Sequence, residues 1–131
     1  MARVLHLIQS LSRGGAARAM TYIAKYTSRL DSYEHAVAGL SAADAHGIEL
    51  AKAAGMRVIP SNDWSQIIAE METADIVHAH WWNCPEFNLF FRKTLPPMRL
   101  IAWFHVAGDK APQIVTNDVV NFVDIALACS P

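Results

Sequence analysis

The sequence predicts an α/β domain built on a parallel sheet, and three observations lead to this fold class. Short, almost unbroken apolar runs, of which residues 4–8 are the first, suit strands that are buried on both faces. Segments with apolar residues at helical spacing separate these runs, so strand and helix alternate along the chain. A pair of glycines, Gly14 and Gly15, joins the first strand to the first helix. This alternation gives right-handed crossovers and a sheet covered on both sides, as in a Rossmann-like doubly wound domain.

The order of the predicted elements is strand, helix, strand throughout, with six strands in all. The predicted strands are residues 4–8, 35–40, 56–59, 75–80, 99–105 and 122–128. The predicted helices are residues 16–30, 41–54, 63–71 and 83–91, followed by a less regular segment between 112 and 121. The expected capping residues are the pairs Ser41 and Asp44, Asp63 and Gln66, and Asn83 and Glu86, with Gly55 as a C-terminal stop.

Length and composition are those of one folded domain. The chain has 131 residues, 53% of them hydrophobic, and a formal net charge of −1. This composition excludes a disordered chain, and the small net charge gives no electrostatic reason to expect nucleic acid. No apolar run is long enough for a transmembrane helix and no signal sequence precedes the first strand, which favours the cytoplasm. Cys84 and Cys129 fit neither a disulfide framework nor a paired metal site, in agreement with a reducing compartment.

Unusual residues gather after the first, fourth and fifth strands. If the strand order is 3-2-1-4-5-6, a ligand is expected beyond the carboxyl ends of the first and fourth strands, where the order reverses. The diglycine bend follows the first strand, and unpaired N–H groups at the start of the next helix make it a natural site for a phosphate. Glycine is expected there for a sharp turn, with a positive φ possible, and for close approach of a ligand to the main chain. The residues that share this predicted rim are Arg13, Gly14, Gly15, His80, Trp81, Trp82, Asn83, His105, Gly108 and Asp109.

Four motifs in this order resemble a known family. They are the diglycine loop with Arg18 after a Val-Leu-His-Leu-Ile strand, the strand at residues 75–80, Phe104-His105 with Gly108 soon after, and the closing residues 128–131. Together they are similar to the N-terminal domain of GT-B glycosyltransferases of the retaining, group-one type. The resemblance spans nearly the whole chain.

The resemblance implies transfer of a sugar from a nucleotide-sugar to an acceptor with retention of configuration. Residues 1–131 would form the acceptor-side domain, and a second Rossmann-like domain that binds the nucleotide-sugar would lie outside this chain. The chain would then be a fragment, or one half of a split enzyme, and inactive alone. The nucleotide-sugar would be a co-substrate, and no metal or other cofactor is expected.

The resemblance also assigns roles to residues. Gly14 and Gly15 would bind the donor's diphosphate through backbone N–H groups and stabilise the charge that grows as the nucleotide leaves. His105 would hydrogen-bond the transferred sugar beside the reacting centre, which makes it the expected catalytic residue. The residues expected to bind the acceptor are Arg13, Arg18, His80, Trp81, Trp82 and Asn83.

Several alternatives stay open beside this interpretation. The diglycine bend could instead be a tight turn that packs a helix against the sheet and binds nothing, although its position at the switch point favours a binding role. A dinucleotide-binding site is disfavoured because the Gly-x-Gly-x-x-Gly spacing is absent and no acidic residue ends the second strand. From a different class, a flavodoxin-like module would bind a phosphorylated small molecule without catalysis.

Histidines and tryptophans near the fourth strand allow further readings. His78 and His80 face the same side of a strand, so a zinc site with Cys84 and His105 can be imagined, but no tight second pair of ligands fixes a tetrahedron and no metal site is expected. His78, near the end of its strand, and His6, in the middle of the first strand, are both expected to be satisfied within the fold. One of the two tryptophans is expected to pack in the core, and Cys84 to be a buried or half-buried thiol.

Arg18, Lys25 and Arg29 fall near one face of the first helix. This face is expected to be an ordinary solvated one. It would allow a peripheral contact with an anionic membrane that carries a lipid-linked acceptor, although three charges alone are too few for stable attachment.

Overall fold

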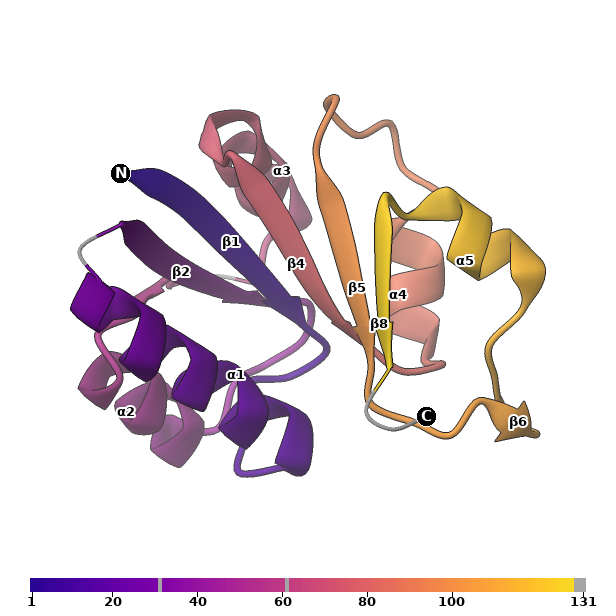
Figure 1. Cartoon of the computed structure of the whole chain (residues 1–131), viewed down its shortest axis with the longest axis horizontal. Helices are drawn as coiled ribbons and strands as arrows, with labels where there is room; N and C mark the ends of the chain where they lie inside the picture. The colour runs from indigo at the N-terminus through magenta and orange to yellow at the C-terminus, as the bar shows by residue number, and fades with distance from the viewer. Residues whose placement is uncertain (31, 61, 129–131) are drawn as a thin grey trace.

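The computed structural model describes residues 1–30, 32–60 and 62–128. Its centre is a six-stranded parallel sheet with the order β3-β2-β1-β4-β5-β8 (Figure 1). The strands are β1 Ala2–Ile8, β2 Tyr33–Gly39, β3 Arg57–Val58, β4 Ile76–Trp81, β5 Leu100–Phe104 and β8 Ile125–Ala128. This arrangement confirms the predicted Rossmann-like α/β class and the predicted strand order. It is not the flavodoxin order, in which the first strand lies between the second and third.

Helices cover both faces of the sheet (Figure 1). The helices are α1 Gly15–Thr27, the short 3-10 helix η1 Ser28–Leu30, α2 Ala45–Ala53, α3 Trp64–Thr73, α4 Pro85–Phe90 and α5 Asn117–Phe122. Neighbouring residues of β1 point to opposite faces, so Ile8 packs with α1 and α2 while Leu5 and Leu7 pack with α3 and α4. The chain therefore has two apolar layers, one on each side of the sheet.

The layer under α3 and α4 is the larger of the two. Phe87 and Phe90 of α4 are fully buried there, and the ring of Phe90 meets Trp64 edge-on at 5.4 Å between centroids. The opposite face is covered by α1 and α2 over β1, β2 and β3, whereas β8 lies at the edge of the sheet with Ile125 and Leu127 exposed. Where β1 and β4 adjoin on the face of α1 and α2, the buried side chains include three histidines, His6, His78 and His80.

Helix caps follow the prediction only in part. Asp63 is the N-cap of α3 and accepts a hydrogen bond from the N–H of Ser65, and Gly55 ends α2 with a φ of +84°. The capping box expected from Ser41 is wrong, because α2 begins later and Asp44 is its N-cap. The cap expected from Asn83 is also wrong, since Cys84 holds that position before Pro85 and makes no side-chain cap.

The segment after β5 holds an element that the sequence did not predict. Strands β6 Asp109–Lys110 and β7 Gln113–Ile114 pair antiparallel in a small hairpin (Figure 1). Gly108 leads into it with a φ of +82°, in the left-handed region that favours glycine. The irregular helix expected between residues 112 and 121 is the shorter α5. Residues 129–131 of the closing motif, including Cys129, lie outside the described residues, as does Asp31.

No helix among the described residues combines the length and the apolar character that a membrane span requires.

Candidate functional site

The predicted rim exists as one edge of the sheet. Because β1, β4 and β5 are adjacent and parallel, their carboxyl ends meet at the same edge, near the start of α1 (Figure 1). The N–H of His105 donates to the carbonyl oxygen of Trp81 at 3.2 Å, which ties the end of β5 to the end of β4. The diglycine bend, the tryptophan corner and His105 therefore follow three neighbouring strand ends.

The two glycines of the bend have ordinary backbone angles. Gly14 is the N-cap of α1 with φ −63° and ψ 169°, so the positive φ considered for this bend is not found. A β-carbon on Gly15 would meet no atom within 4 Å outside its own helix, and one on Gly14 would make only an ordinary contact with Ser12. The fold therefore does not explain why glycine occupies these positions, whereas close approach of a ligand to the N–H groups would explain it.

The two arginines expected to bind the acceptor lie on the α1 and α2 side of the molecule. Arg13 is exposed and its guanidinium lies 4.0 Å from the carboxylate of Asp44, a weak surface pair. Arg18 is also exposed, and it lines a hollow between α1 and α2 together with Lys25 and His46. The structure does not bring Arg18 to the corner that follows β4.

At that corner the three expected acceptor residues have different environments. Trp81 is only 4% exposed and packs edge-on against Phe104, so it is a core residue and the expected acceptor contact does not fit it. The amide of Asn83 is used within the protein, because its Nδ2 donates to Pro112 O and its backbone N–H donates to Gln113. Trp82 is half-buried and remains the aromatic side chain available for an acceptor.

Sequence reasoning missed Gln9, which lies at the switch point itself. Its Nε2 donates to Ser41 Oγ at 3.2 Å and to Glu86 Oε1 at 3.4 Å, and Ser41 Oγ donates back to the Gln9 carbonyl at 2.9 Å. These bonds join the ends of β1 and β2 to α4. The position of Gln9, directly after an apolar strand, was the signal that could have identified it.

A chain of hydrogen bonds runs through five side chains from the middle of the sheet to the rim. Thr27 Oγ1 contacts His35 Nε2 at 2.7 Å, His35 Nδ1 contacts His6 Nε2 at 2.9 Å, and His6 Nδ1 contacts His80 Nε2 at 2.9 Å. His80 Nδ1 then contacts His105 Nε2 at 3.0 Å. His105 is thus held by a row of buried imidazoles that cross β2, β1 and β4.

The bonds of Thr27 fix the direction of this chain. Its hydroxyl donates to the carbonyl of Ile23 at 2.7 Å, so its oxygen accepts the Nε2–H of His35. His35 Nδ1 must then accept from His6 Nε2–H, and His6 Nδ1 carries a lone pair aimed at His80. His80 donates its Nε2–H to that lone pair and accepts from His105 at Nδ1.

Burial keeps these imidazoles neutral. Desolvation, followed by the charges of neighbouring histidines, lowers the pKa of His6 and of His80 well below the ordinary value, and it lowers the pKa of His78 to about 4. Burial also lowers the pKa of His35 and of His105. At neutral pH each ring therefore carries one proton and can donate one hydrogen bond and accept another.

Two expectations about these histidines change. His80 is completely buried and both its nitrogens are bonded to other histidines, so it cannot touch an acceptor and instead orients His105 from behind. The expectation for His78 is not met, because its buried Nε2 has no hydrogen-bond partner among residues 1–30, 32–60 and 62–128. His78 stacks on His80 at 4.4 Å between ring centroids.

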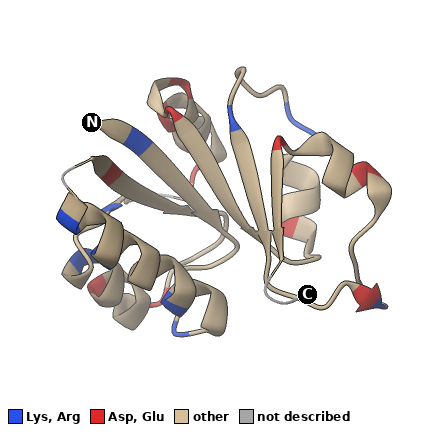
Figure 2. Ribbon diagram, viewed as in Figure 1, with Lys and Arg blue, Asp and Glu red and all other residues tan. Residues whose placement is uncertain are grey.

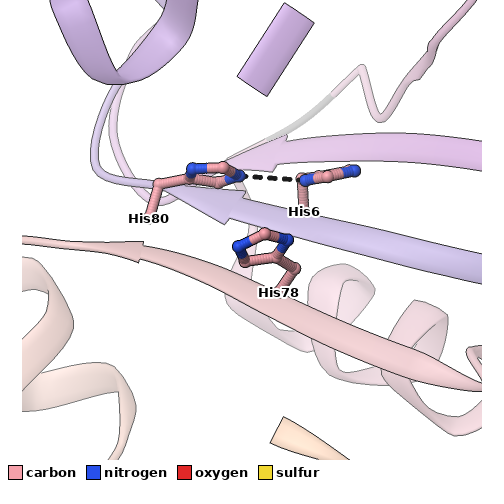
Figure 3. Close-up of side chains that lie close together, drawn as sticks. All are labelled: His6, His78 and His80. Carbon is pink, nitrogen blue, oxygen red and sulfur yellow. Dashed lines mark hydrogen bonds between the residues drawn. The ribbon is translucent and has the colours of Figure 1, made fainter. Parts of the chain in front are cut away.

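The imagined zinc set is not the one that the fold assembles. Cys84 packs in the layer under α3 and α4, on the opposite face from the histidines, and burial is the main cause that raises the pKa of its thiol. His6 takes its place: one ring nitrogen from each of His6, His78 and His80 lies within 4.8 Å of the other two, and the three rings converge in Figure 3. The sequence offered the two-residue spacing on β4, but the contribution of β1 required the strand order and register.

No known protein family, curated protein or solved structure matches the chain.

Proposed function

We propose that this chain is the acceptor-side domain of a retaining GT-B glycosyltransferase, with a nucleotide-sugar as co-substrate. The observation that carries the proposal is the meeting of three features at one edge: the diglycine bend after β1, the Trp82 corner after β4 and His105 after β5. A second domain that binds most of the donor is part of the proposal, so this chain alone is expected to transfer no sugar.

The bend supports a phosphate-binding role. Gly14 begins the 13-residue helix α1 without a side-chain cap, and the free N–H groups and dipole of such a helix start favour an anion there. Gly15 leaves open space beside these groups. A diphosphate can therefore approach the backbone without displacing a side chain.

His105 supports a role beside the transferred sugar. It is half-buried at the end of β5, and its Nε2 is fixed by His80 at 3.0 Å. Burial lowers its pKa, so the neutral imidazole is the form that would bond a sugar hydroxyl at pH 7. His80 would be a positioning residue, since it reaches the sugar only through His105.

The proposal is tested by titrating the isotopically labelled chain with nucleoside diphosphates and nucleotide-sugars and following its amide signals by NMR. We expect weak binding that shifts the amides of Gly14, Gly15 and His105. Gly15→Glu places a carboxylate in the open space at the start of α1. The negative charge interacts favourably with the helix dipole, so the fold should be kept, but it repels a phosphate. The variant should keep the thermal midpoint and weaken binding at least tenfold.

Gln66→Glu is the matched control, because it adds the same charge to the exposed first turn of α3. It should bind the nucleotides as the unchanged chain does. Absence of binding by every nucleotide, or equal affinity of the Gly15→Glu chain, would count against the donor site.

We also propose that the outer face of α1 contacts an anionic membrane that presents a lipid-linked acceptor. Tyr22 and Tyr26 are 60% and 59% exposed on the helix that also carries Arg18 and Lys25, so exposed aromatic and basic side chains occur together there. Figure 2 shows the basic positions of α1 in blue. The chain should float with vesicles of phosphatidylglycerol, and the double variant Tyr22→Ser with Tyr26→Ser should no longer float with them. Equal flotation with uncharged vesicles would contradict this contact.

A further inference from the structure

The cluster of His6, His78 and His80 has features that sugar transfer does not explain. All three side chains are buried, at 0%, 7% and 0% exposure, on a sheet face where aliphatic residues would pack without any polar atom. They come from two adjacent strands, β1 and β4, in parallel register with His6 opposite His78 (Figure 3). A nitrogen from each lies within 4.8 Å of the others.

His78 has a nitrogen without a hydrogen-bond partner. Its Nε2 is buried from solvent and makes no hydrogen bond with the part of the chain that the structure describes, a rare state for a polar atom in a folded protein. Its ring lies 4.4 Å from the ring of His80 and 5.2 Å from that of His6. The ring of His78 is therefore held beside the other two imidazoles.

The surroundings prepare the other two rings for a cation. The hydrogen bonds from Thr27 through His35 place the proton of His6 on Nε2, which leaves the Nδ1 lone pair directed at the cluster. His80 has His105 as a partner for its outer nitrogen, Nδ1. Outer hydrogen bonds of this kind fix the orientation and the tautomer of histidines that bind metals.

We propose that His6, His78 and His80 form a site for a divalent transition-metal ion of the zinc class, which joins β1 to β4. The ligands would be His6 Nδ1, His80 Nε2 and His78 Nε2. Imidazole nitrogen is a common ligand of zinc, and nitrogens at a bond length of about 2.1 Å in a tetrahedral arrangement lie about 3.4 Å apart. Zinc would require His6 and His80 to separate slightly from 2.9 Å, and the nitrogens of the cluster, which lie within 4.8 Å of one another, to adjust to this spacing.

Binding at this site conserves protons. Zinc takes the place of the hydrogen bond between His6 and His80, so the proton on His80 Nε2 must move. It passes to His80 Nδ1, which then donates to His105 Nε2, and the proton of His105 moves to its own Nδ1. Each imidazole keeps one proton, and the ion gains three neutral ligands. The lowered pKa values of the three histidines agree with this, because a metal binds only the neutral ring.

The site is buried and both of its strands lie in the centre of the sheet, so the expected role is structural. The metal proposal does not depend on sugar transfer, since its three ligands lie behind the rim. It is contrary to the sequence-based expectation of no metal site, which combined His78 and His80 with Cys84 and His105.

The test uses the whole chain, freed of metal by a chelator and titrated with Zn²⁺ by calorimetry at pH 7.5. We expect one ion per chain with a raised thermal midpoint, and with Co²⁺ a visible absorption band typical of nitrogen ligands in low coordination. His78→Phe should lose at least tenfold in zinc affinity and lose the cobalt band. Because His78 Nε2 has no partner, this substitution breaks no hydrogen bond at that atom and the chain should fold.

A second variant, His78→Gln, guards against poor packing of phenylalanine, and circular dichroism reports whether each variant is folded. His46→Gln is the matched control, because His46 lies on α2 outside the cluster; it should bind zinc as the unchanged chain does. The proposal is overturned if the folded chain binds no zinc, if both His78 variants bind it with unchanged affinity, or if His46→Gln abolishes binding.

Discussion

Acid is expected to unfold this protein through its buried histidines. The burial of His78 lowers its pKa from 6.5 to about 4, and the titratable groups around it are also histidines: His6 on β1, His35 on β2, His80 on the same strand and His105 after β5. Between these two pKa values His78 is protonated in the unfolded chain and neutral in the folded chain. Stability is therefore fully present above pH 6.5 and is lost as the pH falls toward 4.

The size of the effect follows from this shift. A difference of one pKa unit corresponds to about 1.4 kcal/mol, so the shift of His78 from 6.5 to about 4 corresponds to about 3 kcal/mol in full and about 2 kcal/mol at pH 5. His6 and His80 add to it in the same direction. Small domains are stable by only about 5–15 kcal/mol, so acidification to pH 5 should remove a large part of the stability.

Urea unfolding at several pH values between 7.5 and 5, followed by tryptophan fluorescence and circular dichroism with a chelator present, measures this loss. The range stops at pH 5 because Arg57 lowers the pKa of Glu70 through a hydrogen bond, and that carboxylate loses its contribution only below about pH 4.5. His78→Phe should make the curve flatter by about 2 kcal/mol at pH 5, whereas His46→Gln should not change it. An unfolding free energy that is the same at pH 7.5 and pH 5 would refute the reasoning.

Three further substitutions test the packing of the fold, each by urea unfolding at pH 7.5. Gly47→Ala should destabilise by about 1–3 kcal/mol, because a β-carbon there would lie 2.5 Å from the backbone oxygen of Leu11; an unchanged midpoint would show that α2 packs differently. Asp63→Ala should cost about 1 kcal/mol by removing the cap bond to the Ser65 N–H, and Asp63→Asn should restore most of it. Phe87→Ala should cost about 3–5 kcal/mol because the ring is fully buried, and a loss below 1 kcal/mol would contradict its place in the core.

The sheet could be predicted because its evidence is local. Each strand is an apolar run and each crossover is a helix-length segment, so the parallel topology follows from general rules of connection. The strand order was only assumed from the Rossmann-like class, and a flavodoxin-like order stayed open beside it. The prediction of helix caps failed where several polar residues lie within one turn, as at Ser41 and Asp44. In such a turn the backbone conformation determines which residue begins the helix. The hairpin β6–β7 failed because its two-residue strands are too short for an alternating pattern.

Only the part of the site that lies on a single strand could be predicted from the sequence. The spacing of His78 and His80 shows that they share a face, but the contact between His6 and His80 depends on which strand pairs with β4 and in which register. The sequence also does not show which side chains are buried. A histidine at the end of a strand was expected to bind a ligand, whereas His80 is completely buried. The unpartnered nitrogen of His78 is a property of the packed sheet alone.

The two proposals meet at His80, although each is tested separately. His80 holds His105 at the rim through Nδ1 and is a ligand of the proposed metal through Nε2, so its tautomer connects the interior of the sheet to the edge. Without the ion, the direction set by Thr27 places the proton of His105 on Nε2; with the ion, His80 becomes the donor and that proton lies on Nδ1. A bound ion would thus change whether His105 donates or accepts at a given nitrogen, without moving the backbone of β5. Aliphatic residues would suffice to bury this part of the sheet. It instead carries a continuous row of imidazoles that ends at the rim, and this row is the physical basis for a link between the two sites.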